Sequence, residues 1–161
     1  MLVDFEDLYQ RYSQDVYRFT LYLSGDPSLA EEITQESFVR AWVTPGEISG
    51  GTVKAYLLTI ARNLYLAEGR RVSRQVTFNA SVHDSTSTSN APATGRLDLE
   101  GVLAAVQLLP ESDRVVLLMH AQEGLTHAAI ASVLGLSITA VKVRVHRARM
   151  RLRQLCQPNG E

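Results

Sequence analysis

Hydrophobic residues recur every three or four positions at the start of the chain, which is the period of an amphipathic α-helix. The pattern ends before Gly25, a residue that commonly stops a helix. Asp26 and Pro27 suit the start of a second helix, because aspartate caps free backbone amides and proline is tolerated in a first turn. We expect this helix to span about residues 27–43 and a third helix to span about residues 52–74. The first periodic stretch comprises Phe5, Leu8, Tyr9, Tyr12, Val16, Phe19 and Leu23.

The second half of the chain has the same helical period. Asp98 is placed to cap a helix, Pro110 separates it from the next one, and Gly124 ends that one. Residues 126–137 then indicate a short capped helix, a tight glycine turn and a serine cap, followed by one long helix. This order is typical of a helix-turn-helix. The long helix has one apolar stripe, made of Ile138, Val141, Val145, Ala148, Leu152 and Leu155.

A stretch of different composition separates these two helical halves. Residues 76–96 are rich in serine and threonine and contain few large apolar side chains, which is the composition of a flexible linker. A chain of 161 residues has room for one ordinary domain or two small ones. We therefore predict an all-α fold with two small helical domains, residues 1–75 and 97–161, of which the second contains the helix-turn-helix.

Charge is strongly segregated along the chain, although the net charge is only −1 at pH 7. Residues 1–36 carry eight acidic side chains and two basic ones, whereas residues 138–157 carry six basic side chains and no acidic one. A shorter basic run occupies residues 62–74. Separate acidic and basic surfaces indicate two kinds of partner, a basic protein surface and a polyanion.

The long last helix has the side chains that duplex DNA binding requires. In a helix-turn-helix the second helix enters the major groove, where side chains reach base edges and cations hold phosphates. The predicted base contacts are Thr139, Lys142, Val143 and His146, and the predicted phosphate contacts are Arg144, Arg147, Arg149 and Arg151. The alternative is a solvated basic face on a terminal helix. The turn pattern, the apolar stripe and the unopposed charge together favour DNA binding.

Two sets of short motifs are recognisable, one in each half of the chain. The second half contains Glu123-Gly124-Leu125-Thr126, Leu134-Gly135-Leu136-Ser137 and His146-Arg147-Ala148-Arg149. These closely resemble the fourth conserved region of bacterial sigma factors. The first half contains Gln35-Glu36-Ser37-Phe38-Val39-Arg40-Ala41-Trp42 and Ile60-Ala61-Arg62-Asn63, which look like the second conserved region. A chain with only these two regions is similar to the extracytoplasmic-function (ECF) group of the sigma-70 family.

The resemblance implies an alternative sigma factor, which binds core RNA polymerase, directs it to a promoter and helps to open the duplex, and which is not an enzyme. The second helix would dock on the clamp helices of the largest polymerase subunit, and the polymerase flap would be a further partner. The predicted polymerase contacts are Glu32, Gln35, Glu36 and Phe38, carboxylates and an amide beside an apolar patch. The alternative is a helix that only packs inside its own domain. An anti-sigma protein is also implied.

By the same resemblance, loop 44–51 and the following helix bind the melted minus-ten strand, and the second domain binds the minus-thirty-five element as duplex. A base taken out of the stack needs polar groups for its edge, and asparagine supplies both a donor and an acceptor. The predicted contacts are Asn63, with Arg70 and Arg74 on roughly the same face, and Arg62 and Arg71 as flanking phosphate contacts. Neither step requires ATP or a metal.

Other kinds of site have little support in the sequence. The four histidines accompany no metal-binding motif such as HExxH, so we expect no metal site and no cofactor. The single cysteine, Cys156, has no partner for an internal disulfide. No apolar run is long enough to cross a bilayer, which predicts a cytoplasmic protein without membrane insertion. The competing function is an ordinary DNA-binding regulator that uses only the second domain, with the first domain as a sensor or dimerisation module.

Overall fold

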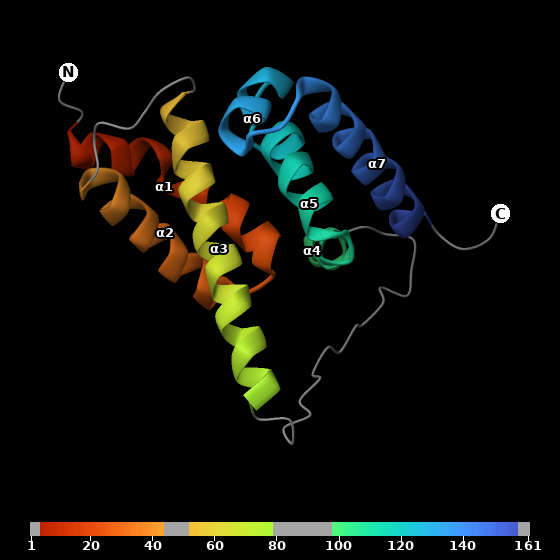
Figure 1. Cartoon of the computed structure of the whole chain (residues 1–161), viewed down its shortest axis with the longest axis horizontal. Helices are drawn as coiled ribbons and strands as arrows, with labels where there is room; N and C mark the ends of the chain where they lie inside the picture. The colour runs from red at the N-terminus through yellow and green to blue at the C-terminus, as the bar shows by residue number, and fades with distance from the viewer. Residues whose placement is uncertain (1–3, 44–51, 79–97, 158–161) are drawn as a thin grey trace.

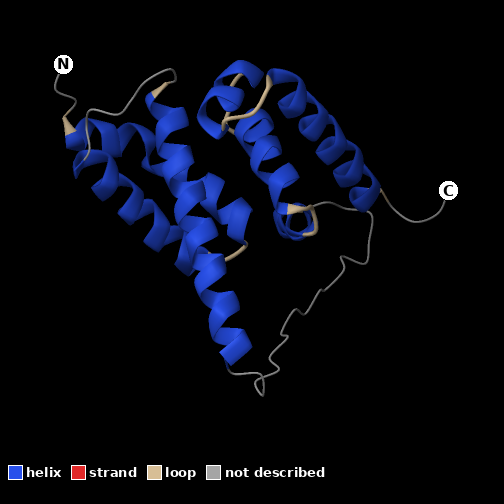
Figure 2. Cartoon of the chain, in the orientation of Figure 1, coloured by secondary structure: helices blue, strands red, loops and turns tan. Residues whose placement is uncertain are grey.

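The computed structural model describes residues 4–43, 52–78 and 98–157, and every regular element in these ranges is a helix (Figure 2). The predicted all-α fold is therefore confirmed for the described residues. Figure 1 shows the first three helices on one side of the molecule and the remaining helices on the other. The elements are α1 (Phe5–Ser24), α2 (Pro27–Val43), α3 (Val53–Phe78), α4 (Leu99–Gln107), α5 (Glu111–Leu117), the π-helix η1 (Leu118–Gln122), α6 (His127–Leu134) and α7 (Ile138–Cys156).

The junction between α1 and α2 is fixed by local capping. Gly25 has the left-handed backbone angle φ of 72°, which lets its N–H donate to the Leu21 carbonyl at 2.7 Å and end α1. The Asp26 carboxylate accepts a hydrogen bond from the Ser28 amide at 3.0 Å, and Pro27 occupies the first position of α2. The two helices are therefore forced to turn back on each other within a few residues.

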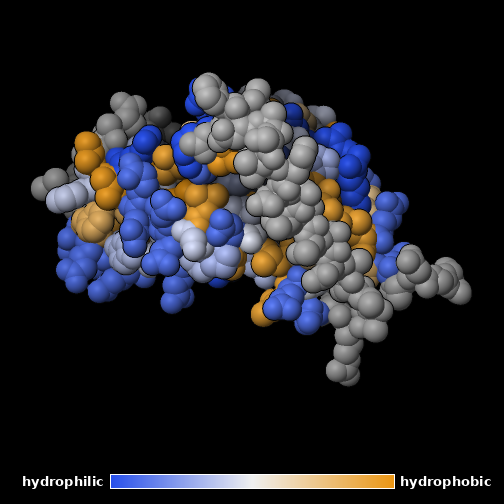
Figure 3. Space-filling view, turned by 90° about the horizontal axis from the view of Figure 1, so that it is seen from below, coloured by the Kyte–Doolittle hydropathy of each residue, from blue (hydrophilic) through white to orange (hydrophobic). Residues whose placement is uncertain are grey.

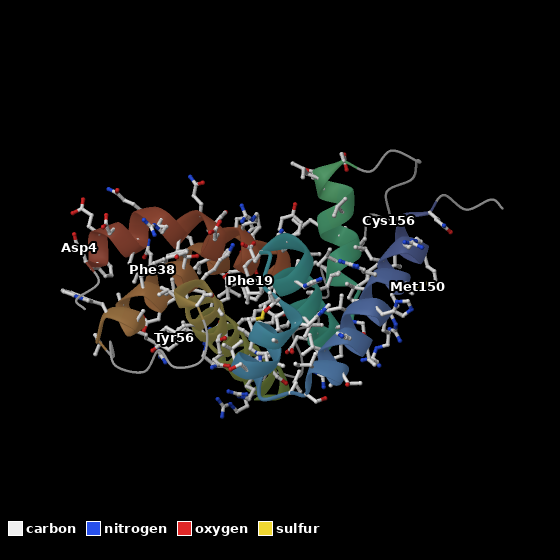
Figure 4. All side chains as sticks on the ribbon, turned by 90° about the horizontal axis from the view of Figure 1, so that it is seen from above. Asp4, Phe19, Phe38, Tyr56, Met150 and Cys156 are labelled. Atoms are coloured by element: carbon white, nitrogen blue, oxygen red, sulfur yellow. The ribbon has the colours of Figure 1, made fainter. Side chains whose placement is uncertain are left out.

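The helices α1, α2 and α3 pack around large buried side chains. Phe19 of α1, Phe38 of α2 and Leu58 of α3 have no exposed surface. In Figure 4 the label of Phe38 lies by α1 and α2, and Phe19 lies further along α1, towards the second half of the molecule. Because these residues belong to the same hydrophobic cluster as Val116 and Ile130, the core continues from the first half into the second.

The helix-turn-helix is formed by α6 and α7, which are bent by 110° relative to each other. The side chain of Thr126 accepts a hydrogen bond from the Ala129 amide at 3.0 Å and starts α6. Gly135, with φ of 68°, ends α6, and the side chain of Ser137 accepts from the Ala140 amide at 3.0 Å to start α7. The angle lies within the usual range of about 90–120° for this motif, and the predicted helix-turn-helix is confirmed.

A buried carboxylate joins the two halves of the chain. The side chain of Glu123 is fully buried and accepts hydrogen bonds from the Arg18 guanidinium of α1 at 3.0 and 2.8 Å. The ammonium group of Lys54, at the start of α3, lies 3.2 Å from the same carboxylate and donates to the Glu123 backbone carbonyl at 2.8 Å. The hydrogen bonds with Glu123 raise the pKa of Arg18 above its usual value. Asp15 of α1 also lies 2.9 Å from Arg18 and 3.5 Å from Lys54, so two cations and two carboxylates form one network between the halves.

A buried cation joins the halves at a second place. Arg114 of α5 donates to the Leu23 carbonyl at 2.7 Å, near the C-terminal end of α1, and to the Leu109 carbonyl at 2.8 Å. Carbonyls at a helix end carry partial negative charge, so a guanidinium placed there is stabilised without a carboxylate. Gly25 lies close by, since a Cβ atom there would be 3.0 Å from the Gln107 side chain. The end of α1 is therefore tightly packed against α4 and α5.

The predicted domain boundaries concern residues that the structure describes only in part. The helix α3 continues to Phe78, three residues beyond the predicted end of the first domain at residue 75. Residues 79–96 of the predicted linker and the predicted loop 44–51 lie outside the described residues. The proposed boundaries stay predictions, and the contacts between the halves are an addition that the sequence did not indicate.

We expect Glu123→Gln to lower the free energy of unfolding by about 2 kcal/mol, because it removes the buried negative charge between Arg18 and Lys54. Urea denaturation followed by circular dichroism measures the effect. The matched control is Glu68→Gln, which breaks the exposed pair of Glu68 with Arg71 on α3 and should leave the unfolding midpoint unchanged. Equal unfolding midpoints for Glu123→Gln and the wild-type chain would contradict the role given to this carboxylate.

Candidate nucleic-acid interface

The outward face of α7 is a band of polar and basic side chains. Val141, Val145 and Ala148 are buried in the interior of the second half. The helical period of 3.6 residues therefore turns the residues between them outward. Of the predicted DNA contacts, the following are exposed: Thr139, Lys142, Val143, His146, Arg147, Arg149 and Arg151. The helix is thus held by one face and offers the other to a partner.

Arg147 has a structural partner that the sequence did not indicate. Its guanidinium donates to both oxygens of the buried Asp113 carboxylate on α5, at 2.9 and 2.7 Å. These hydrogen bonds raise the pKa of Arg147 above its usual value. The guanidinium is half exposed, but two of its nitrogens are committed to holding α7 against α5. Arg147 is therefore a poorer test of phosphate binding than Lys142 or Arg149.

Arg144 and Arg62, predicted to contact duplex and melted strand respectively, line one small cavity of about 40 Å³. Arg62 comes from α3, whereas the same cavity is also lined by Glu111 of α5 and Leu134 of α6, so it lies between the two halves. Both arginines are only partly exposed. The Nη1 group of Arg62 donates to the Asn63 side-chain oxygen at 3.0 Å, while its Nε is buried without a hydrogen-bond partner. In this arrangement the two arginines are less exposed than the other predicted nucleic-acid contacts.

The other predicted melted-strand residues lie along the outer surface of α3. Asn63, Arg70, Arg71 and Arg74 are exposed. Arg71 is held by Glu68 through two hydrogen bonds of 3.0 and 2.7 Å, which raise its pKa above the usual value. Figure 1 shows this second half of α3 projecting beyond α1 and α2. Among the described residues, these side chains lie on the outer surface of α3.

The outward face of α2 carries the predicted polymerase contacts except one. Glu32, Gln35 and Glu36 are exposed. The prediction for Phe38 is wrong for this structure, because its ring is 0% exposed and packs against the ring of Tyr9 with centroids 5.0 Å apart. A side chain in the core has no surface to offer a partner, so Phe38 shapes α2 from the inside.

Two exposed valines, and not Phe38, supply the apolar part of the outward α2 face. Val39 is 48% exposed and Val43 is 71% exposed, one and two turns beyond Glu36. The signal was present in the sequence, because residues 32, 35, 36, 39 and 43 recur at steps of three and four and so share one edge of a helix. Carboxylates and an amide next to exposed valines form a polar rim around an apolar centre.

A further apolar surface lies where α4 meets the end of α7. Leu108, which directly follows α4, is 65% exposed there, whereas the exposed Leu99 lies at the other end of α4. An open groove of about 410 Å³ is lined by Leu108, Leu155 and the basic Arg151, among others. Seen from below, orange hydrophobic residues interrupt the hydrophilic surface at several places (Figure 3). Leu108 and Leu155 therefore place apolar surface next to a cation in this groove.

The described part of the chain offers neither a metal site nor a single membrane-spanning helix. Residues 4–43, 52–78 and 98–157 contain no group of three or more histidine, cysteine, aspartate or glutamate side chains placed to hold a metal ion. None of their helices is by itself long and apolar enough to span a membrane. The bent pair of α6 and α7 reaches the required length and composition only when both helices are taken together.

Comparison with known families matches both halves of the chain separately. Residues 8–75 match sigma-70 region 2, and residues 99–152 match sigma-70 region 4. The first match includes α2 and most of α3, and the second includes α6 and most of α7. The competing hypothesis, a DNA-binding regulator that uses only its second domain, does not explain why residues 8–75 match sigma-70 region 2.

Individual relatives give the same result over most of the chain. The chain is 32% identical over 158 residues to the ECF RNA polymerase sigma factor SigL of Mycobacterium tuberculosis, covering 95% of this chain and 89% of SigL. It is 30% identical over 143 residues to the ECF RNA polymerase sigma factor EcfG of Rhodopseudomonas palustris, covering 88% of this chain and 79% of EcfG.

A solved structure agrees in fold. The sigma factor RpoE of Bartonella quintana, crystallised in complex with the anti-sigma factor NepR, superimposes with a TM-score of 0.81 at 27% identity and covers 96% of this chain and 97% of that one. Family, relatives and fold therefore coincide over both halves. The chain belongs to the ECF group of the sigma-70 family, and its function is that of an alternative sigma factor in transcription initiation, not of an enzyme.

Proposed function

We propose that the chain holds core RNA polymerase through the outward face of α2 and promoter DNA through α7 and α3. The observation that carries this proposal is the exposed basic face of α7, where Lys142 and Arg149 point outward and residues 138–157 contain no carboxylate. Such a face binds the phosphates of a duplex and positions the neighbouring Thr139, Val143 and His146 over base edges. The minus-thirty-five element is the proposed duplex site.

The α2 face supports the polymerase part of the proposal. Glu32 presents negative charge, Glu36 is exposed beside Arg40 at 3.1 Å, and Gln35 adds hydrogen-bonding groups. Val39 and Val43 add exposed apolar surface. A basic partner surface with an apolar centre is complementary to this arrangement, and we assign that role to the clamp helices of the largest polymerase subunit. The apolar groove between α4 and α7 is the candidate contact for the polymerase flap.

The exposed side of α3 supports a role in holding melted DNA. Asn63 offers a donor and an acceptor for the edge of an unstacked base, and Arg70 and Arg74 follow on roughly the same face. Arg71 and the partly buried Arg62 are the proposed flanking phosphate contacts, and Arg62 requires a change in its surroundings to act in this way. This assignment gives the minus-ten element to the first domain and the minus-thirty-five element to the second.

Regulation and location follow from the same assignment. The sigma factor RpoE of Bartonella quintana is known in a complex with an anti-sigma factor, and we propose that an anti-sigma protein also binds this chain. We propose the cytoplasm as its location, because a factor that binds core polymerase and promoter DNA has to work where both are found.

Run-off transcription with purified core polymerase tests the proposed function. Templates drawn from the genome of the host should give discrete transcripts only when this chain is added to core polymerase. Binding of the chain to duplex DNA without any polymerase-dependent transcript would favour the simple regulator instead.

The double substitution Glu32→Ala with Gln35→Ala should weaken binding to core polymerase about tenfold, because it removes a carboxylate and an amide from the proposed contact. Fluorescence titration of labelled chain with core polymerase measures the dissociation constant. Asp7→Ala with Gln10→Ala is the matched control, since it removes the same two kinds of exposed group at the same spacing from α1. An equal loss in both double variants would exclude a specific α2 contact.

Lys142→Ala should weaken binding of the whole chain to a short duplex about threefold or more at low salt and reduce the slope of log K against log salt by about one. The reason is the loss of one cation from the duplex face, so that the DNA releases about one counterion fewer on binding. Arg11→Ala removes an exposed cation from α1 and should leave the slope unchanged. An unaltered slope for Lys142→Ala would mean that α7 does not bind the duplex through this residue.

A further inference from the structure

Two histidines stack on each other beside the helix-turn-helix. The ring of His120 in η1 and the ring of His127, the first residue of α6, have centroids 4.2 Å apart and planes inclined by 22°. The Nδ1 atom of His120 lies 2.8 Å from the Leu125 backbone carbonyl oxygen. A carbonyl only accepts hydrogen bonds, so Nδ1 carries the hydrogen and the position of this ring is fixed. The His127 ring therefore stacks on a His120 ring whose orientation is fixed.

The surroundings of His127 are positively charged. The helix α6 packs against η1, α7 and α3. The neighbours that lower the pKa of the His127 ring are His120 of η1 and Lys142 and Arg149 of α7, and no residue of α3 is among them. Desolvation first, and then these three neighbours, lower the pKa of His127 below its usual value of about 6.5. No carboxylate among the described residues raises the pKa of the His127 ring.

This cluster of four cationic or ionisable groups adjoins the proposed duplex face. Lys142 and Arg149 are seven residues apart on α7, which places both on one side of the helix, two turns from each other. The side chain of His127 is partly exposed beside them. The arrangement lacks a negative charge, and a phosphodiester group of a DNA backbone supplies one.

We propose that His127, supported by His120 and flanked by Lys142 and Arg149, binds a backbone phosphate of duplex DNA and takes up a proton when it does so. This inference rests on the proposed binding of duplex by α7. It adds a contact from α6 to the recognition helix and makes the strength of DNA binding depend on pH.

The direction of the pH dependence follows from the charges. In the free chain the neighbouring cations disfavour the protonated imidazole, whereas a bound phosphate favours it. The complex therefore holds more protons than the separate molecules, and its affinity rises as the pH falls through the pKa of His127 in the complex. The increase in affinity is complete once the pH lies below the pKa of His127 in the free chain, which is lower than its pKa in the complex.

Fluorescence anisotropy of a labelled duplex about 30 base pairs long tests the inference with the whole chain at low and constant salt. The duplex has an arbitrary sequence, because phosphate contacts do not depend on sequence. For the wild-type chain the affinity should rise about threefold to tenfold from about pH 8 to about pH 6. His127→Gln should remove most of this rise. His127→Lys, which keeps a charge at every pH, should bind tightly with little dependence on pH.

A second measurement separates a phosphate contact from a change in folding. Proton NMR of the whole chain should show the pKa of His127 rising when the duplex is added, and the thermal unfolding of His127→Gln should match that of the wild-type chain. In His146→Gln, which alters the other histidine of the duplex face, the pH dependence should persist whatever happens to the affinity.

The outcomes distinguish this inference from the proposed function. Duplex binding that is weakened by Lys142→Ala but keeps its full pH dependence in His127→Gln would overturn the phosphate site and leave the α7 assignment standing. A pKa of His127 that does not change on binding would likewise overturn the phosphate site. Failure of the wild-type chain to bind any duplex would overturn both.

Discussion

The buried carboxylate of Glu123 is the contact on which the arrangement of this molecule depends. It lies at the end of the helix that precedes the helix-turn-helix and is neutralised by Arg18 and Lys54 from the opposite half. Arg114 adds a second buried link, in which a cation rests on backbone carbonyls at the end of α1. Charged groups buried in this way are stable only when both halves are in place. The two halves therefore pack over one continuous core.

This packing leaves surfaces of opposite charge facing outward. Helix α2 buries Ile33 and Phe38 and exposes its carboxylates, while α7 buries Val141 and Val145 and exposes its cations. A net charge of −1 conceals this separation. Opposite surface charges guide different partners and discourage the wrong ones. A sigma factor needs such a separation, because it has to bind a protein and a polyanion at the same time.

The sequence predicted what depends on near neighbours and missed what depends on distant ones. Helix ends at Gly25, Thr126 and Ser137 were predictable, because each cap involves residues within four positions. The role of Phe38 was not, since helical spacing gives the face of a residue but not which of several faces is buried. The ion pair of Arg147 with Asp113 is not visible in the sequence either, because the two residues lie 34 positions apart. Contacts of this kind appear only once the chain is folded.

The most direct test is whether one molecule of the chain binds core polymerase and duplex DNA together. Size-exclusion chromatography of purified chain, core polymerase and a labelled promoter duplex resolves the possible complexes. We expect the chain to elute with the polymerase and the duplex to join this complex only when the chain is present. Elution of the chain with duplex alone, and never with polymerase, would contradict the assignment of one surface to each partner.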